Sequence, residues 1–138
     1  MRRTALMLGL ALAAGIAVGV IGDQVLNAQQ EPVKRTVLLR TDLAGMEGKE
    51  VLMINVEIAP GAVSGKHYHH GHELAYVLEG SGILEIEGKP PVTLKAGEAA
   101  YQPPKQVHEG KNTSTTAPLK TLSIVIAEKG QPITVPVK

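Results

Sequence analysis

The stretch of sequence from residue 61 to residue 80 reads GAVSGKHYHHGHELAYVLEG, and it decides the fold. Side chains on an extended strand alternate between two faces, so His67 and His69 point to the same face. Glu73 follows four residues later, and His108 lies about forty residues further along the chain. Two imidazoles, a carboxylate and a distant third imidazole suit a divalent transition metal such as Mn, Fe, Co, Ni, Cu or Zn. The alternative is a polar loop of solvated imidazoles, which would explain a single histidine better than it explains this spacing.

Two further histidines, His70 and His72, lie in the same stretch but have the opposite parity. On an unbroken strand their side chains would face away from the other imidazoles. Gly71 lies between them and gives the chain a point where it can turn and bring the following carboxylate back. We therefore expect His70 and His72 to be exposed, or to contact the metal ligands from outside, rather than to bind the ion.

The spacing of these residues resembles the two motifs of the cupin superfamily. The first motif is matched by Gly61, five residues, His67-Tyr68-His69, three residues, Glu73, six residues and Gly80. The second is matched by Gly97, five residues, Pro103-Pro104-Lys105, two residues, His108, three residues and Asn112. Both motifs at this separation are typical of a small, single-domain bacterial cupin.

This resemblance implies an all-β fold, a single antiparallel β-barrel of jelly-roll character. It also implies that His67, His69, Glu73 and His108 converge on one metal ion inside the barrel. Lys105 is a departure from the family pattern, which has glycine at this position. A non-glycine residue in a left-handed turn costs on the order of 1 kcal/mol. The turn before His108 is therefore a place where the loop geometry of this chain can differ.

Alternation of apolar and polar residues supports the same fold class outside the motifs. It is clearest over residues 51–58, 83–87 and 122–126, and weaker over residues 37–40, 74–78, 92–94 and 99–101. The chain also contains 15 glycines and 9 prolines, which favour many turns. Several short strands separated by such turns predict an antiparallel barrel or sandwich.

The parity of Glu73 predicts the wall of the metal pocket. Ala75 and Val77 share its face, so we expect a small, apolar wall there. We expect the opposite face of this strand to pack into the core, and it carries Leu74, Tyr76 and Leu78.

Three other residues near the second motif invite a prediction. Either Tyr101 or Gln102 could reach the cavity, and the sequence leaves both open. Tyr101 is the only weak candidate for a catalytic acid or base, because no other acidic or basic residue can be assigned to the pocket. Asn112 is expected to hold its hairpin by side-chain hydrogen bonds.

The N-terminal part of the chain differs from the rest. Residues 5–21 form an uncharged apolar run of 17 residues that follows Arg2 and Arg3. This pattern predicts that residues 1–28 are a signal peptide or an apolar helix that anchors the chain in the membrane. Residues 29–35 read as a linker and residues 36–138 as the cupin domain, which would lie outside the cytoplasm, in the periplasm or secreted.

Composition narrows the choice of partners. The 14 Lys and Arg residues balance 13 Asp and Glu residues, which argues against nucleic-acid binding. No cysteine is present, so a metal must be held by nitrogen and oxygen ligands. A domain of this size buries a modest core, and we therefore consider a homodimer formed through a sheet.

Two functional hypotheses follow from the sequence. The first is a metal-binding cupin with metal-centred chemistry, of the dioxygenase or Lewis-acid type, on a small oxygenated substrate. The second is a non-catalytic module that binds a metal or a small ligand. No catalytic residue can be assigned, because the same barrel hosts enzymes, regulators and storage proteins.

Overall fold

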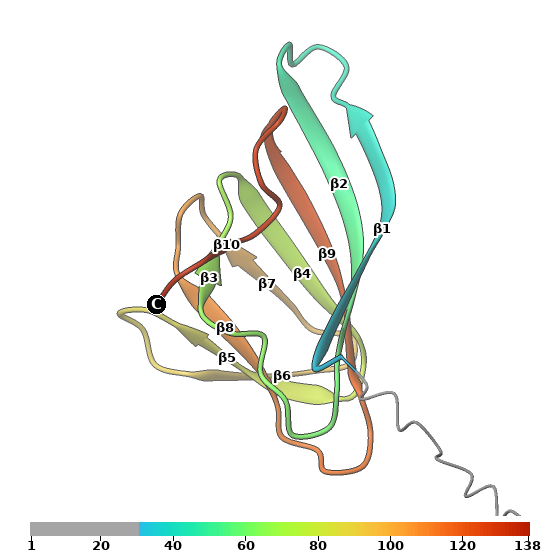
Figure 1. Cartoon of the computed structure of the whole chain (residues 1–138), viewed down its shortest axis with the longest axis vertical. Helices are drawn as coiled ribbons and strands as arrows, with labels where there is room; N and C mark the ends of the chain where they lie inside the picture. Colours follow the sequence, from blue (N-terminus) through green and yellow to red (C-terminus); the bar gives the residue numbers. More distant parts are fainter. Residues whose placement is uncertain (1–30) are drawn as a thin grey trace, which may run out of the picture.

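The computed structural model describes residues 31–138, and all regular elements in that part of the chain are β-strands (Figure 1). The strands are β1 (Val33–Asp42), β2 (Lys49–Ile58), β3 (His67–Tyr68), β4 (His72–Glu79), β5 (Ser81–Ile86), β6 (Val92–Lys95), β7 (Ala99–Gln102), β8 (His108–Asn112), β9 (Leu119–Glu128) and β10 (Val135–Pro136). No helix in this range is long and apolar enough to cross a membrane. The signal or anchor helix predicted for residues 1–28 lies outside the described residues.

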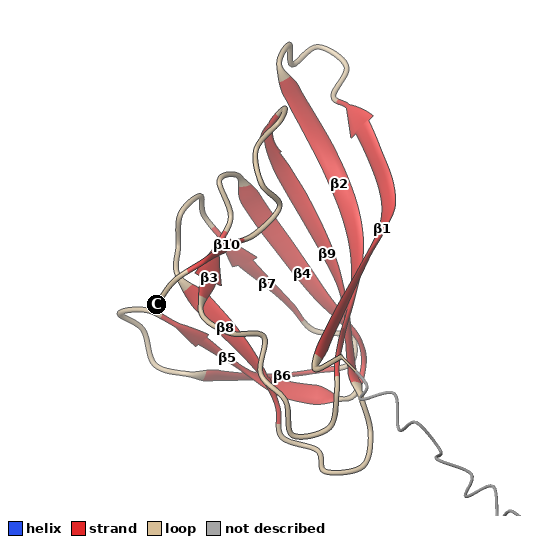
Figure 2. Ribbon diagram, viewed as in Figure 1, coloured by secondary structure: helices blue, strands red, loops and turns tan. Residues whose placement is uncertain are grey.

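The strands form two five-stranded antiparallel sheets, with the orders β1-β2-β9-β4-β7 and β10-β3-β8-β5-β6. Figure 2 shows the two sheets facing each other, with the upper ends of β1, β2 and β9 extending beyond the smaller sheet. This arrangement confirms the predicted all-β, antiparallel jelly-roll architecture. β1 begins at Val33, inside the segment that the sequence assigned to a linker.

The clearest alternation in the sequence, over residues 51–58, corresponds to the inner face of the β1-β2-β9-β4-β7 sheet, called the larger sheet below, whereas the apolar stripe over residues 122–126 lies on the outer face of that sheet. Leu52, Ile54 and Ile58 of β2 are all buried, and they pack in two clusters between the sheets. Val125 of β9 joins the first cluster and Val77 of β4 joins the second. Each such side chain contributes about 1.5–3 kcal/mol through the removal of apolar surface from water.

The first strand contains an irregularity that determines where its two arginines point. Arg35 pairs in register with Val56, and Arg40 pairs with Leu52. A register shift between Val37 and Leu39 interrupts the ladder. Residues five apart on a regular strand face opposite sides, but the extra residue at this shift brings both arginines to the inner face.

The opposite face of β4 corrects one prediction from the sequence. Leu74, Tyr76 and Leu78 are 45%, 44% and 43% exposed, so the prediction that this face packs into the core is wrong. The parity was right, and Ala75 and Val77 do line the interior with Glu73. The error arose because the barrel has one interior, and no element of residues 31–138 covers the outer face of this sheet.

The turn before His108 keeps a left-handed conformation despite its lysine. Lys105 has φ 65°, and its backbone N–H donates to the carbonyl of His69 at 2.8 Å. Asn112, at the end of β8, is buried, and its amide donates to the carbonyls of Ile58 at 3.0 Å and Ala117 at 2.9 Å. The predicted structural role of Asn112 is therefore confirmed.

Gly71 is required for a reason that differs from the one expected. A Cβ atom at this position would lie 2.0 Å from the carbonyl oxygen of Ile126 on the neighbouring strand β9. Glycine therefore lets the start of β4 approach β9.

Candidate metal centre

Three imidazoles meet between the two sheets. His67 on β3 and His108 on β8 are register partners, and their ring centroids lie 4.4 Å apart. His69 follows β3, and its ring centroid lies 5.1 Å from that of His67 and 5.3 Å from that of His108. One nitrogen atom from each residue lies within 4.8 Å of the others, and all three side chains are buried. The structure thus brings the three predicted histidines together as a group that could hold a metal ion.

Backbone carbonyls orient each ring of this group. Nδ1 of His67 lies 2.7 Å from the carbonyl oxygen of Gly65, and Nδ1 of His108 lies 2.8 Å from that of Gln106. Nδ1 of His69 lies 2.5 Å from the carbonyl oxygen of Ile133. Because a carbonyl oxygen can only accept, Nδ1 carries the proton in each ring and Nε2 keeps its lone pair. This is the orientation that metal-binding histidines adopt.

Glu73 faces these rings from the other sheet. Its Oε2 lies 3.0 Å from Nε2 of His108 and 3.2 Å from Nε2 of His69. Its Oε1 accepts a hydrogen bond from the Oγ of Ser123 at 2.5 Å. Nε2 of His69 has no partner with hydrogen-bond geometry. Lone pairs that meet a carboxylate oxygen repel it unless a cation, either a proton or a metal ion, lies between them, so this donor set fits a metal ion.

Titration of the buried groups agrees with this interpretation. Burial lowers the pKa of His67 to about 4, so its ring is neutral at pH 7 and free to act as a ligand. Burial alone would raise the pKa of Glu73, but the contacts with His108 and His69 hold it well below its usual range. Burial likewise opposes a charge on His69, but the contact and charge of Glu73 raise its pKa above the ordinary value. The centre therefore contains a carboxylate that attracts a cation.

The group of three histidines lies in a cavity of about 100 Å³. A single water needs about 10–15 Å³ of such space, so the cavity has room for a molecule of a few heavy atoms. Its apolar wall includes Ile54, Val56, Ala75, Val77 and Leu119. The predicted small, apolar wall beside Glu73 is confirmed.

The structure resolves the choice between Tyr101 and Gln102. Gln102 is 2% exposed and lines the cavity. Tyr101 is 53% exposed on the outer face, where its hydroxyl lies 2.7 Å from Nδ1 of His72. Tyr101 is therefore excluded as a catalytic acid or base in the cavity. His72 lies away from the metal-binding group, as predicted, and the ring of His70 lies at 5.6 Å from that of Tyr68.

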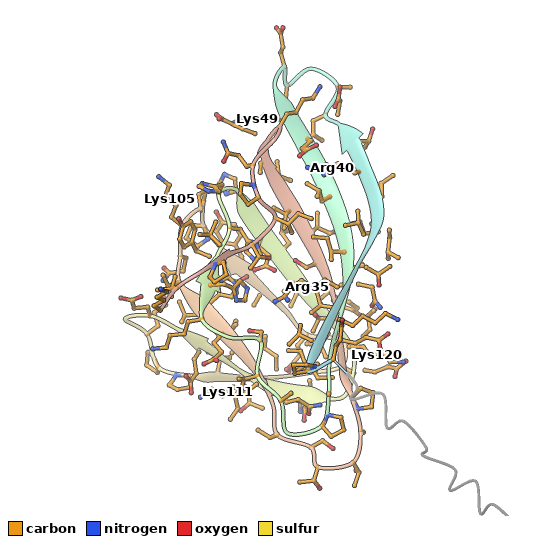
Figure 3. The ribbon with its side chains drawn as sticks, viewed as in Figure 1. Arg35, Arg40, Lys49, Lys105, Lys111 and Lys120 are labelled. Carbon is orange, nitrogen blue, oxygen red and sulfur yellow. The ribbon has the colours of Figure 1, made fainter. Side chains whose placement is uncertain are left out.

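Arg35 is a cavity residue that sequence reasoning missed. It lines the cavity together with the histidines, and Figure 3 shows it projecting from β1 toward the space between the sheets. The expectation that no basic residue belongs to the pocket is therefore wrong. The alternation in residues 37–40 was not extended to residue 35. β1 also carries Lys34, Arg40 and Asp42, so its charge pattern gave no signal that singles out Arg35.

Comparison with known proteins places the chain in a family. The family model described as "Cupin domain" matches residues 54–125, which is more than half of the chain. The protein therefore belongs to the cupin family, as its two motifs indicated.

Three similar proteins illustrate the range of this family. An oxalate-binding protein from Thermotoga maritima is 33% identical over 82 residues, which are 59% of this chain and 66% of the relative, just under two thirds. The crystal structure of a cupin-like protein from Thermotoga maritima is 27% identical, with a TM-score of 0.60 over 76% of this chain and 75% of that one. A protein with a double-stranded β-helix domain from Klebsiella pneumoniae shares the fold at 24% identity, with a TM-score of 0.63 over 78% and 87% of the two chains.

Proposed function

We propose that this cupin binds a divalent transition metal through His67, His69, Glu73 and His108, and holds a small oxygenated ligand at that metal. The observation that carries the proposal is the orientation of the three imidazoles. Each donates Nδ1–H to a backbone carbonyl and turns Nε2 toward the same carboxylate-lined centre. A ring that is only solvated would have no need of such a partner.

The donor set narrows the identity of the ion. Three imidazole nitrogens and one carboxylate oxygen suit Mn, Fe, Co, Ni, Cu or Zn better than Ca or Mg. When bound, such an ion supplies Lewis acidity and positions for small oxygen ligands. The contribution of the chain is to orient the four ligands and to exclude bulk water with the apolar wall.

The cavity supports a small ligand rather than a large one. Its volume of about 100 Å³ leaves no room for a nucleotide or an oligosaccharide. The oxalate-binding protein from Thermotoga maritima binds, by its name, a ligand of this size. We infer that the ligand of this chain is a similarly compact, oxygen-rich molecule.

Binding is better supported than turnover. Among the described residues that line the cavity, the titratable ones are the four proposed ligands and Arg35. A guanidinium group is protonated at neutral pH and cannot act as a general base. This set favours a non-catalytic binding module. The convergent metal ligands favour the second candidate, metal-dependent chemistry of the dioxygenase or Lewis-acid type, which needs no protein base. Dioxygen uptake by the metal-loaded protein in the presence of the ligand distinguishes a dioxygenase from a binding module.

Elemental analysis tests the metal proposal. Protein purified from its native compartment should carry about one transition-metal ion per chain, and His108→Ala should remove most of it. His72→Ala is the matched control, because His72 is exposed on the outer face. Metal that survives His108→Ala but is lost in His72→Ala would place the ion on the surface and contradict the proposal.

The outer face of the larger sheet supports a homodimer. A continuous apolar row crosses its five strands, because Leu39 pairs with Met53, Met53 with Ile124, Ile124 with Leu74, and Leu74 with Tyr101. The neighbouring rows on this face add Leu122, Ile126 and Tyr76 but also the polar side chains of Thr41, Asn55 and His72. An exposed apolar row of this kind is often a functional surface.

We infer that a second copy of this chain covers this face. The charged pairs Lys49–Glu128 and Lys120–Glu79 lie at its two ends, while its centre is uncharged. An apolar centre with a charged rim is typical of a protein interface. Leu74→Lys should convert a dimer to a monomer in analytical ultracentrifugation. Val92→Lys, at an exposed valine of the other sheet, should not change the assembly. A monomeric wild-type protein would contradict the inference.

The proposed location outside the cytoplasm rests on residues 1–28. A reporter that is active only in the periplasm, fused after Lys138, should be active. Activity only of a cytoplasmic reporter would contradict export. N-terminal sequencing then separates a cleaved signal peptide from a retained membrane anchor.

A further inference from the structure

The cavity gathers the polar groups that lack partners within residues 31–138. Three side chains in that range have buried polar atoms without a hydrogen bond, namely His69, Gln102 and Thr134. All three line the metal cavity. Since more than nine in ten buried polar groups in proteins are hydrogen-bonded, their concentration in one cavity points to a ligand there.

Of these three residues, His69 is a proposed metal ligand, and Gln102 is the one with two polar atoms that lack a partner. It is 2% exposed, and both its amide nitrogen and its amide oxygen lack partners. It lies on β7 in register with Glu73 on β4, so it borders the metal-binding group. An amide offers a donor and an acceptor to a ligand that binds beside the ion.

Arg35 adds a positive charge to the same cavity. Within residues 31–138 it makes no hydrogen bond and no ion pair, although it lines the cavity with Gln102 and Thr134. Glu73 is the carboxylate of the cavity, but its Oε1 accepts a hydrogen bond from Ser123 and its Oε2 faces Nε2 of His69 and His108. The guanidinium group is therefore available to an anion that enters the cavity.

Arg40 shows what a paired arginine on this strand looks like. It lies on the same face of β1, and its guanidinium group donates to both carboxylate oxygens of Glu50, at 2.9 and 2.7 Å. Figure 3 shows Arg40 near the upper end of the sheet and Arg35 lower, toward the middle of the molecule. The same strand thus carries one arginine held by a protein carboxylate and one without such a partner.

We propose that Arg35 and Gln102 recognise a small organic di-acid bound at the metal, with one carboxylate on the ion and the second on Arg35. This assignment rests on the proposed function, because it requires the metal. The planar guanidinium fork matches a carboxylate through two parallel hydrogen bonds. The apolar wall favours an anion with a carbon body over inorganic phosphate, which presents only polar oxygens. The cavity volume limits that body to a few atoms, as in oxalate or malonate.

Calorimetric titration of the metal-loaded, full-length protein with malonate tests the assignment. Arg35→Gln should weaken malonate binding at least tenfold, and Arg35→Lys should weaken it less because the charge is kept. Gln102→Met, which preserves size, should weaken it several-fold. Arg40→Gln is the matched control and should bind malonate like the wild type. Equal binding by Arg35→Gln and wild type would overturn the assignment.

Acetohydroxamate separates recognition from a general structural effect. It can chelate the metal but has no second acid group, so Arg35→Gln should bind it with unchanged affinity. An equal loss of malonate and acetohydroxamate would overturn the role of Arg35. Inorganic phosphate that binds more tightly than malonate would overturn the di-acid.

The metal content of each variant separates this inference from the proposed function. Arg35→Gln should retain the metal of the wild type. If the wild type holds metal but binds no malonate, the di-acid inference fails while the metal site stands. If the wild type holds no metal, the proposed function itself fails.

Discussion

The two faces of the β1-β2-β9-β4-β7 sheet differ in which side chains they bury, and the inner face buries polar groups beside its apolar core. The inner face buries Glu73, Gln102 and Ser123, each at less than a tenth of its possible exposure. The outer face exposes Leu74 and Tyr101 at 45% and 53%. Buried polar groups are tolerated where they bind one another or a ligand, and exposed apolar rows are tolerated where another surface covers them. This difference underlies the two proposals for the sheet, a metal and ligand site on its inner face and a dimer interface on its outer face.

The largest expected effect is on metal affinity, and it compares Glu73 with His72, which are adjacent in sequence and lie on opposite faces of β4. Glu73→Ala removes an inner-face ligand and should weaken metal binding by more than about 100-fold, because changes one step further from an ion already cost about 10–100-fold. His72→Ala on the outer face should leave metal affinity unchanged. Competition with a chelator measures both. Similar losses in the two variants would remove the distinction between the faces.

The loss of stability in acid should come from the cavity between the two sheets, where His67 of β3 is buried. The unfolded chain protonates a histidine near pH 6.5, whereas burial lowers the pKa of folded, metal-free His67 to about 4. The contribution of His67 to stability is therefore complete above pH 6.5. It is lost as the pH falls from about 6.5 to about 4, by up to about 3 kcal/mol. His67→Gln should remove this part of the pH dependence in denaturant unfolding of the metal-free protein.

Two other groups in the cavity, His69 and Glu73, also make the free energy of unfolding depend on pH. The raised pKa of His69 gives a contribution that is present at low pH and lost as the pH rises through its folded value. The lowered pKa of Glu73 gives one that is present above its unfolded value and lost on acidification below it. The difference between wild type and His67→Gln isolates the His67 contribution. An unchanged pH profile in His67→Gln would show that burial does not lower this pKa.

Packing should also differ between the faces. Val77→Ala removes two buried methyl groups from the inner face and should lower the free energy of unfolding by about 2 kcal/mol. Leu78→Ala, at the adjacent exposed position, should change it by no more than about 0.5 kcal/mol when the protein is monomeric. Chemical unfolding at low protein concentration measures both. A loss in Leu78→Ala as large as that in Val77→Ala would mean that the outer face is packed within one chain.

The smallest effect is expected in the turn that leads to His108, away from both faces. Lys105 adopts φ 65°, which is unfavourable for a residue with a Cβ atom. Lys105→Gly should stabilise the fold by about 0.5–1 kcal/mol, because relief of this strain exceeds the entropic cost of glycine. Metal affinity should stay the same. Thermal unfolding with metal present and absent gives both values, and a lower melting temperature would contradict the interpretation of the turn.

Spacing and parity were sufficient to predict several features from the sequence. Three histidines two or about forty residues apart, with the glycines and prolines of the two motifs, predicted the family and the meeting of His67, His69 and His108. The period of two places His67 and His69 on one strand face, whereas the convergence of His108 with them was implied by the resemblance to the two cupin motifs. The binding of a metal by these residues and Glu73 stays a prediction.

Pairing between strands decided what the sequence left open or misjudged. Gln102 rather than Tyr101 enters the cavity because β7 pairs with β4 in the register that aligns Gln102 with Glu73. Arg35 faces inward because it pairs with Val56 of β2, and a register shift between Val37 and Leu39 brings Arg40 to the same face. Neither register nor a bulge can be read from local alternation, since each depends on hydrogen bonds to a strand that is distant in sequence.

The sequence by itself thus determined the alternation, the turns and the group of candidate ligands, because these follow from local chain geometry. Only the tertiary structure decided which face of each strand is covered. Tyr76 has the alternation of a core residue, yet it is 44% exposed because the second sheet packs on the opposite side of β4. Burial depends on which sheet packs against which face, and that choice is made by the whole fold rather than by any one strand.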